Sequence, residues 1–155
     1  MGESHELVVP PDTYRVAKAG VLRADLNAAV AICVHDDTQG TGGLLHLKYV
    51  ATDQDRPLEL TDSTLSSGLL LMDRFCKELR AAGARKQSWL VCLFGHTPER
   101  PDLHEPAATV LDLVKAYFND SRRPIECREL RRPHAITVRL EAREGGIVVS
   151  PATEG

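Results

Sequence analysis

Aromatic residues and methionine are scarce in this sequence, which holds one Trp, three Tyr, three Phe and two Met among 155 residues. It has no run of 18 apolar residues, so no membrane-spanning helix is expected. The stretch 1–9 is acidic and lacks the basic flank and apolar core of a secretory signal peptide. Basic and acidic side chains nearly balance, at 19 and 22, which predicts neither nucleic acid nor a membrane surface as a partner. We therefore expect a cytoplasmic protein.

The cysteines and histidines show no spacing typical of a disulfide framework or a metal site. The cysteines lie in separate apolar stretches without a CxxC pair: Cys33, Cys76, Cys92 and Cys127. The histidines considered as ligands share no helical i, i+4 spacing: His35, His46, His96 and His104. His46 could still meet His96, because both fall at strand ends. We expect buried thiols and solvated histidines, with no bound metal and no cofactor.

Seven segments have the apolar, β-branched or alternating composition of strands: 13–16, 30–35, 44–50, 89–94, 125–130, 135–140 and 146–149. Residues 36–40 supply turn chemistry, and Gly42 and Gly43 end the loop before the third segment. This pattern favours an antiparallel hairpin of 30–35 with 44–50. A loop is expected over 51–60.

Two segments show helical periodicity. From Asp62, apolar residues recur at spacings of four and three and are predicted to form one buried face: Leu65, Leu69, Met72, Cys76 and Leu79. Asp62 or Ser63 can cap this helix and Gly83 can end it. A second helix is predicted from near Pro106 to Phe118. We therefore predict an α+β sandwich of mostly antiparallel strands with two main helices, in one domain over 1–155 with flexible ends at 1–12 and 150–155.

The only local basic concentration lies late in the chain: Arg122, Arg123, Arg128, Arg131 and Arg132. Glu126 and Glu129 are interleaved with it and dilute its field. A solvated edge with salt bridges is expected there rather than an anion site.

The predicted hairpin carries the most specific motif. Residues 26–36 read Leu-Asn-Ala-Ala-Val-Ala-Ile-Cys-Val-His-Asp, and residues 42–47 read Gly-Gly-Leu-Leu-His-Leu. These blocks resemble Leu-Gly-Ser-Cys-Val-Ala-Val-Cys and Gly-Gly-x-x-His of the chemoreceptor glutamine deamidase (CheD) family. His46 follows Ala29 by seventeen residues, the interval that this family keeps between its cysteine nucleophile and its histidine base. The helix end at 79–85 and the strand end at 93–96 are similar to the family in pattern.

The resemblance implies a chemistry that the chain cannot complete as it stands. Family members hydrolyse the side-chain amide of receptor glutamines by thiolate attack, which requires a cysteine within hydrogen-bond reach of a histidine. Here Ala29 occupies the position of the nucleophile and His46 that of the base. An alanine cannot form the thioester intermediate, so the sequence excludes the family mechanism.

Several neighbouring positions also depart from the family pattern. The family's Gly-Ser before the cysteine is Asn27-Ala28, and its second glycine after the central strand is His96. Its threonine six residues before the cysteine falls on Arg23, or on Ala24 with one gap, and neither side chain can orient an imidazole as a hydroxyl does. Residues 104–108 stand where the family has a Gly-x-Arg-Asn loop. The residues expected to line the remaining binding site are Arg23, Asn27, Ala28, Gly43 and His96.

Cys33 is the nearest other thiol to the position of the nucleophile. It lies four strand residues beyond Ala29, about 13 Å along an extended chain, so it is expected to be a buried core thiol.

Two origins of Ala29 stay open. Several changes around the motif are typical of relaxed selection and predict a pseudoenzyme that acts as a protein-binding signalling or chemotaxis regulator. The alternative is an active protein-glutamine deamidase, of chemoreceptor or toxin type, whose cysteine was replaced by Ala29. Both hypotheses predict a protein partner: chemoreceptor helices, a CheC-like phosphatase or another glutamine-bearing protein. A third interpretation treats the chain as an α+β binding domain whose motif match is a coincidence.

Overall fold

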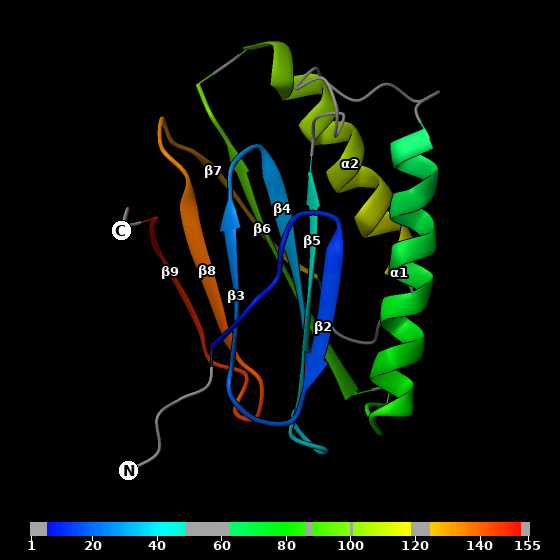
Figure 1. Ribbon diagram of the computed structural model, residues 1–155. Coiled ribbons are helices and arrows are strands. Elements are labelled where there is room, and N and C mark those ends of the chain that lie inside the picture. The colour runs from blue at the N-terminus through cyan, green and yellow to red at the C-terminus, as the bar shows by residue number, and fades with distance from the viewer. Residues whose placement is uncertain (1–5, 49–62, 86–87, 100, 119–124, 153–155) are drawn as a thin grey trace.

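The computed structural model describes residues 6–48, 63–85, 88–99, 101–118 and 125–152, which form three layers (Figure 1). Two helices cover one face of a five-stranded sheet, and a four-stranded sheet covers the other face. Five of the seven strand pairings are antiparallel. The predicted α+β sandwich of mostly antiparallel strands and two main helices is thus confirmed.

The five-stranded sheet has the order β2-β5-β4-β6-β7. Its strands are β2 (Thr13–Ala17), β4 (Ala29–Asp36), β5 (Thr41–Lys48), β6 (Trp89–Thr97) and β7 (Glu126–Arg131). β4 and β5 form the predicted antiparallel hairpin, and β4 also pairs antiparallel with β6. Every residue of the central strand β4 is buried, which explains its continuous apolar composition.

The four-stranded sheet has the order β1-β3-β8-β9. Its strands are β1 (Glu6–Val8), β3 (Val21–Leu26), β8 (Ile136–Glu141) and β9 (Ile147–Pro151). Alternate residues of β3 and β8 face the first sheet and share one core with it: Leu22, Ala24, Leu26, Ile136, Val138 and Leu140. The outward residues of β3 include Arg23 and Asp25, as expected for a sheet with one face toward solvent.

The helices α1 (Ser63–Ala81) and α2 (His104–Tyr117) pack against the opposite face of the five-stranded sheet. A short 3-10 turn, η2 (Pro101–Leu103), precedes α2. The buried face of α1 contains Met72, Phe75, Cys76 and Leu79. Close packing leaves no space beside Gly43, where an added Cβ would lie 2.6 Å from Cε1 of Phe75. β5 is therefore held tightly against α1.

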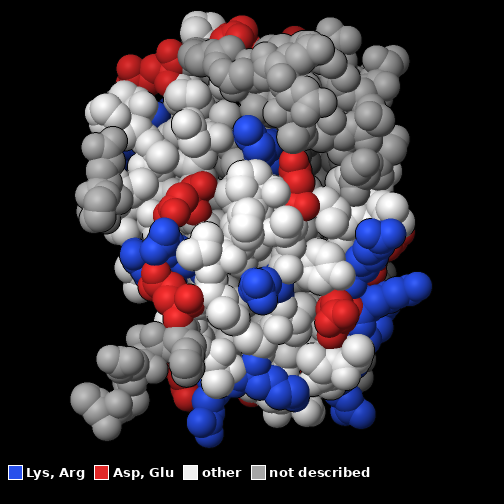
Figure 2. Space-filling model, viewed as in Figure 1, with Lys and Arg blue, Asp and Glu red and all other residues white. Residues whose placement is uncertain are grey.

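Charged side chains of both signs are interspersed on the face shown in Figure 2, over a mostly uncharged middle. This agrees with the near balance of 19 basic and 22 acidic residues. None of the helices in the described part of the chain has both the length and the apolar content of a transmembrane helix.

Two details differ from the sequence-based expectations. β1 and β3 were not predicted, because Arg23, Ala24 and Asp25 give β3 little of the composition that favours strands. Leu69 was placed on the buried face of α1, but it is 40% exposed. Gly83, at φ 97°, ends α1 as predicted. The expected loop over 51–60 and the possible cap at Asp62 lie outside the described residues, as does the side chain of Leu65.

Candidate functional site

A two-residue turn between β3 and β4 places Ala29 at the first position of the central strand. Ala28 in this turn has φ 54°, a left-handed conformation that costs a residue with a Cβ about 1 kcal/mol. Asn27 is exposed, whereas Ala28 and Ala29 are buried, and Ala29 has no exposed surface at all. At the position expected for the CheD cysteine nucleophile, the chain thus has a methyl group that is fully buried.

Strand register places Ala29 near both candidate histidines. Ala29 lies opposite Lys48 of β5 and opposite His96 of β6, and Ala31 lies opposite His46. Opposite residues share a face, as do residues two apart in one strand, so these side chains all point between the two sheets. His46 is a diagonal neighbour of Ala29, a relation in which Cα atoms are roughly 7–8 Å apart.

His46 is held in the protonation state that a general base requires. Its Nδ1 lies 2.9 Å from the carbonyl oxygen of Val9, which can only accept, so Nδ1 carries the proton and Nε2 has a free lone pair. Burial lowers the pKa of His46 below 6.5 and outweighs the Val9 carbonyl and the charge of Asp12, which raise it. The imidazole is therefore neutral at pH 7, with its proton on Nδ1 and none on Nε2.

His96 has the opposite arrangement. Its Nδ1 accepts the backbone N–H of Ala28 at 3.2 Å, and its Nε2–H donates to the Arg132 carbonyl oxygen at 3.0 Å. Burial lowers its pKa, against the hydrogen bonds to backbone carbonyl groups that raise it. With both ring nitrogens bonded, His96 fixes the turn rather than serving as a base.

The two histidines do not meet. β5 and β6 flank β4 on opposite sides, which separates His46 from His96 by two strand spacings, about 9.5 Å across the sheet. Within the described residues, no group of three or more His, Cys, Asp or Glu side chains could hold a metal ion.

No protein-family model matches the chain. It is 26% identical over 148 residues to the "Probable chemoreceptor glutamine deamidase CheD" of Bordetella petrii, a match that covers 92% of this chain and 64% of that protein. The protein of the same name from Bordetella avium is 24% identical over 154 residues, or 95% of this chain and 66% of that protein. That from Burkholderia orbicola strain MC0-3 is 30% identical over 88 residues, or 57% of this chain and 35% of that protein.

The chain is thus similar to proteins named as CheD. The matched regions span at most 66% of the length of these three relatives.

Neither residue at the position expected for the CheD threonine directs a polar side chain toward His46. Arg23 lies on the outer face of β3, where it forms ion pairs with Glu6 at 2.8 Å and Asp25 at 2.9 Å. Ala24 faces the core but offers only a methyl group. The carbonyl of Val9 orients His46 instead, and sequence patterns gave no signal for it because every residue carries a carbonyl group.

Of the other residues predicted to line the site, three lie beside Ala29 and one lies on the opposite face of the five-stranded sheet. Ala28 and His96 are bonded to each other beside Ala29, and Asn27 adjoins them at the surface. Gly43 faces α1, on the side of β5 opposite to His46, and its missing side chain makes room for Phe75. The structure thus places Ala28 and His96 on one side of Ala29 and His46 on the other, and it directs Arg23 and Gly43 elsewhere.

Cys33 is excluded as a replacement nucleophile by burial rather than by distance. Because Ala31 lies opposite His46, Ala29 and Cys33 are each two residues from that position along β4. The expectation that distance along the strand, about 13 Å, keeps Cys33 away from His46 is therefore wrong. Cys33 is only 2% exposed, and burial, with a smaller contribution from Cys92, raises the pKa of its thiol. At neutral pH it stays a protonated core thiol.

Proposed function

We propose that this CheD-like protein is a pseudoenzyme, inactive as a glutamine deamidase, that acts as a protein-binding regulator in cytoplasmic signalling or chemotaxis. The observation that carries the proposal is the buried methyl group of Ala29 at the position of the nucleophile. Without a thiolate there is no thioester intermediate, and the covalent route to amide hydrolysis is closed.

The backbone beside Ala29 adds an independent obstacle to catalysis. Amide hydrolysis through a covalent intermediate needs backbone N–H groups free to stabilise the oxyanion. The Ala28 N–H is donated to His96, and Ala29 is paired with strands on both sides. His96 stands where the CheD family has a glycine. Its imidazole accepts the Ala28 N–H, which a glycine at that position would leave without this acceptor.

The partner is proposed from the relatives. Their name refers to chemoreceptors, which makes the helical cytoplasmic region of a chemoreceptor the first candidate. A CheC-like phosphatase and another glutamine-bearing protein are the other two. A regulator needs to bind its protein partner but does not need to catalyse a reaction. A protein that keeps the CheD-like sandwich without the nucleophile can still bind a partner through its surface.

A second candidate function is protein-glutamine deamidation by a form of this chain with cysteine at position 29. The observation in its favour is the free Nε2 of His46, which is of no evident use beside an alanine. A thiol there would give its proton to Nε2, and the thiolate would attack the glutamine Cδ. Ammonia would leave with that proton, and water would hydrolyse the thioester to glutamate.

One set of variants separates the two candidates. We would assay Ala29→Cys, and Ala29→Cys combined with His46→Gln, for ammonia release from a purified chemoreceptor cytoplasmic fragment, and detect glutamate formation by mass spectrometry. The pseudoenzyme proposal expects no release from either variant. Release by Ala29→Cys that disappears with His46→Gln would establish the second candidate instead.

Binding is tested on the unaltered chain by calorimetric titration with the same receptor fragment and with a CheC-like phosphatase. The regulator proposal expects saturable binding to at least one of them. Binding to neither protein would overturn the proposed partners. It would favour the third interpretation, in which the chain is an α+β binding domain and its motif match is a coincidence.

A further inference from the structure

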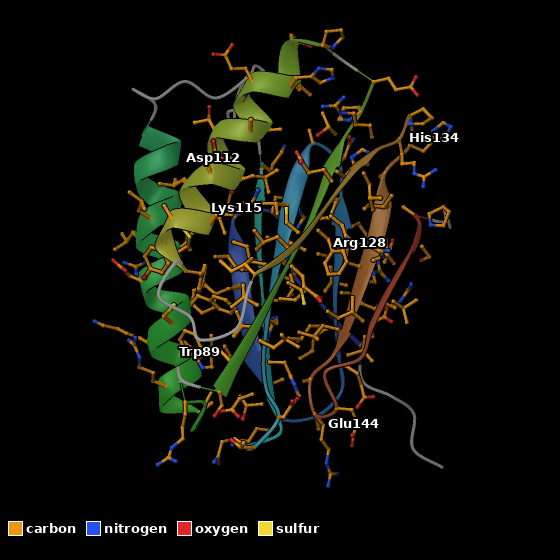
Figure 3. The ribbon with its side chains drawn as sticks, turned by 180° about the vertical axis from the view of Figure 1, so that it is seen from behind. Trp89, Asp112, Lys115, Arg128, His134 and Glu144 are labelled. Carbon is orange, nitrogen blue, oxygen red and sulfur yellow. The ribbon has the colours of Figure 1, made fainter. Side chains whose placement is uncertain are left out.

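A groove of about 650 Å³ opens between β7, the turn that follows it, and the β8–β9 pair, where the edges of the two sheets separate. Figure 3 shows this side, with Arg128 on β7 and His134 at the turn to β8. Its volume is in the range of small-molecule sites, roughly 300–1,000 Å³. It adjoins the candidate site at Arg132, whose carbonyl group binds His96.

The floor of the groove is apolar. Leu130 of β7 lies opposite His96 in the strand register and so faces the space between the sheets. Ile136 of β8 and Val149 of β9 approach from the other sheet and pack in the same core. These three side chains form a surface that would hold an alkyl chain or an aromatic ring.

The rim of the groove is cationic. Glu129 is one acidic residue in the lining, beside Arg128, Arg132 and His134. Strand alternation places the Arg128 side chain on the inner face of β7 with Leu130, and directs the side chains of Glu129 and Arg131 toward the other face. Cys127, two residues before Glu129, packs against the core on that other face. Glu126, on the inner face, accepts a hydrogen bond from Cys92 and does not line the groove.

Arg132, His134 and Ser150 complete the rim. Among the residues that the structure describes, neither Arg128 nor Arg132 forms an ion pair. The salt bridges expected for this basic cluster are therefore not made by its two groove residues. Two guanidinium groups above an apolar floor favour a ligand with a negative head and an apolar body.

We propose that this groove binds a small amphipathic carboxylate, with its carboxylate at Arg128 and Arg132 and its apolar body on Leu130, Ile136 and Val149. A peptide strand is the poorer fit, because Pro133 and Pro151 in the lining have no N–H to donate to a backbone carbonyl. The site does not depend on the proposed regulatory function, and it requires no residue of the Ala29 turn.

The test is a titration followed by ¹H–¹⁵N NMR, with octanoate as the probe. Octanamide tests the apolar body without the charge, and acetate tests the charge without the apolar body. We expect octanoate to shift the amide signals of Leu130, Ile136 and Val149, and to bind about tenfold more tightly than octanamide, since hydrogen bonds to charged groups dominate the difference. Acetate should bind too weakly to saturate.

Substitutions distinguish a built site from general attraction to a basic edge. Arg128→Gln and Arg132→Gln should each weaken octanoate binding about tenfold and leave octanamide binding unchanged. Arg131→Gln is the matched control, because it removes one charge from the same strand on the opposite face and should change neither. The amide spectrum of each variant verifies that it is folded. Equal affinity for octanoate and octanamide, or an equal loss in Arg131→Gln, would overturn the proposal.

Discussion

The backbone N–H of Ala28 is donated to Nδ1 of His96, which follows it by 68 residues in the sequence. This bond joins the turn before β4 to the end of β6, and the second ring nitrogen of His96 ties the same point to Arg132. His46, on the other side of β4, keeps one nitrogen free. The two buried imidazoles therefore differ: His96 holds the backbone with both nitrogens, whereas His46 uses one nitrogen and keeps Nε2 unprotonated near Ala29.

Replacing His96 should destabilise the fold. His96→Ala leaves a cavity and removes the partners of the Ala28 N–H and the Arg132 carbonyl, which should lower the free energy of unfolding by about 2–4 kcal/mol. His104→Ala, at an exposed position, is the control and should change it by less than about 0.5 kcal/mol. Urea unfolding of both variants measures the difference, and equal midpoints would refute the structural role of His96.

The two buried histidines make stability depend on pH near neutrality. Burial lowers the pKa of His46 and of His96 below 6.5, so the unfolded chain takes up protons at a higher pH than the folded chain. Stability should therefore fall as the pH decreases from about 7 to about 5.5. Below about pH 4.5, the lowered carboxyl pKa of Asp36 predicts a further loss.

Urea midpoints across this range measure the effect. His46→Gln should reduce the pH dependence, because it removes one of the two buried imidazoles. A flat stability profile between about pH 7.5 and 5.5 would contradict the assignment of two buried neutral imidazoles.

A methyl group should be tolerated at one buried glycine and not at another. The Cβ of Gly43→Ala would lie 2.6 Å from Phe75, which should lower the free energy of unfolding by about 1–3 kcal/mol. At Gly68 in α1 the nearest atom is Cδ2 of Leu47 at 3.9 Å, and Gly68→Ala should raise stability by up to about 1 kcal/mol through helix propensity. Thermal unfolding of both variants compares them, and the same direction of change in both would be inconsistent with this packing.

The core thiols should resist alkylation in the order of their burial. Cys33 is nearly inaccessible and its thiol pKa is raised, whereas the partly exposed Cys127 should react first with iodoacetamide at pH 8. Mass spectrometry after brief labelling of the native protein identifies the modified residue. Rapid labelling of Cys33 would revive it as a candidate nucleophile.

The hairpin and its motif could be predicted because their signals are local. The apolar run of β4, the turn after it and the seventeen-residue interval from Ala29 to His46 can all be recognised in the sequence alone. The partners of the histidines could not, because Val9 and Arg132 contribute only carbonyl groups and reach them through long-range strand pairing. The position of Leu69 depended on where α1 rests against the sheet, which periodicity does not fix.

Gly42 and Gly43 belong to the motif that suggested a deamidase, yet Gly42 packs against the backbone of Ala142 and Gly43 against the ring of Phe75. A Cβ on Gly42 would lie 2.9 Å from Ala142 in the turn after β8, and one on Gly43 would meet Phe75 of α1. The pair sets how closely the helices and the second sheet can approach β5, a requirement that does not depend on whether any amide is cleaved. Because packing requires these glycines, their presence in a sequence does not distinguish active deamidases from inactive proteins of the same fold.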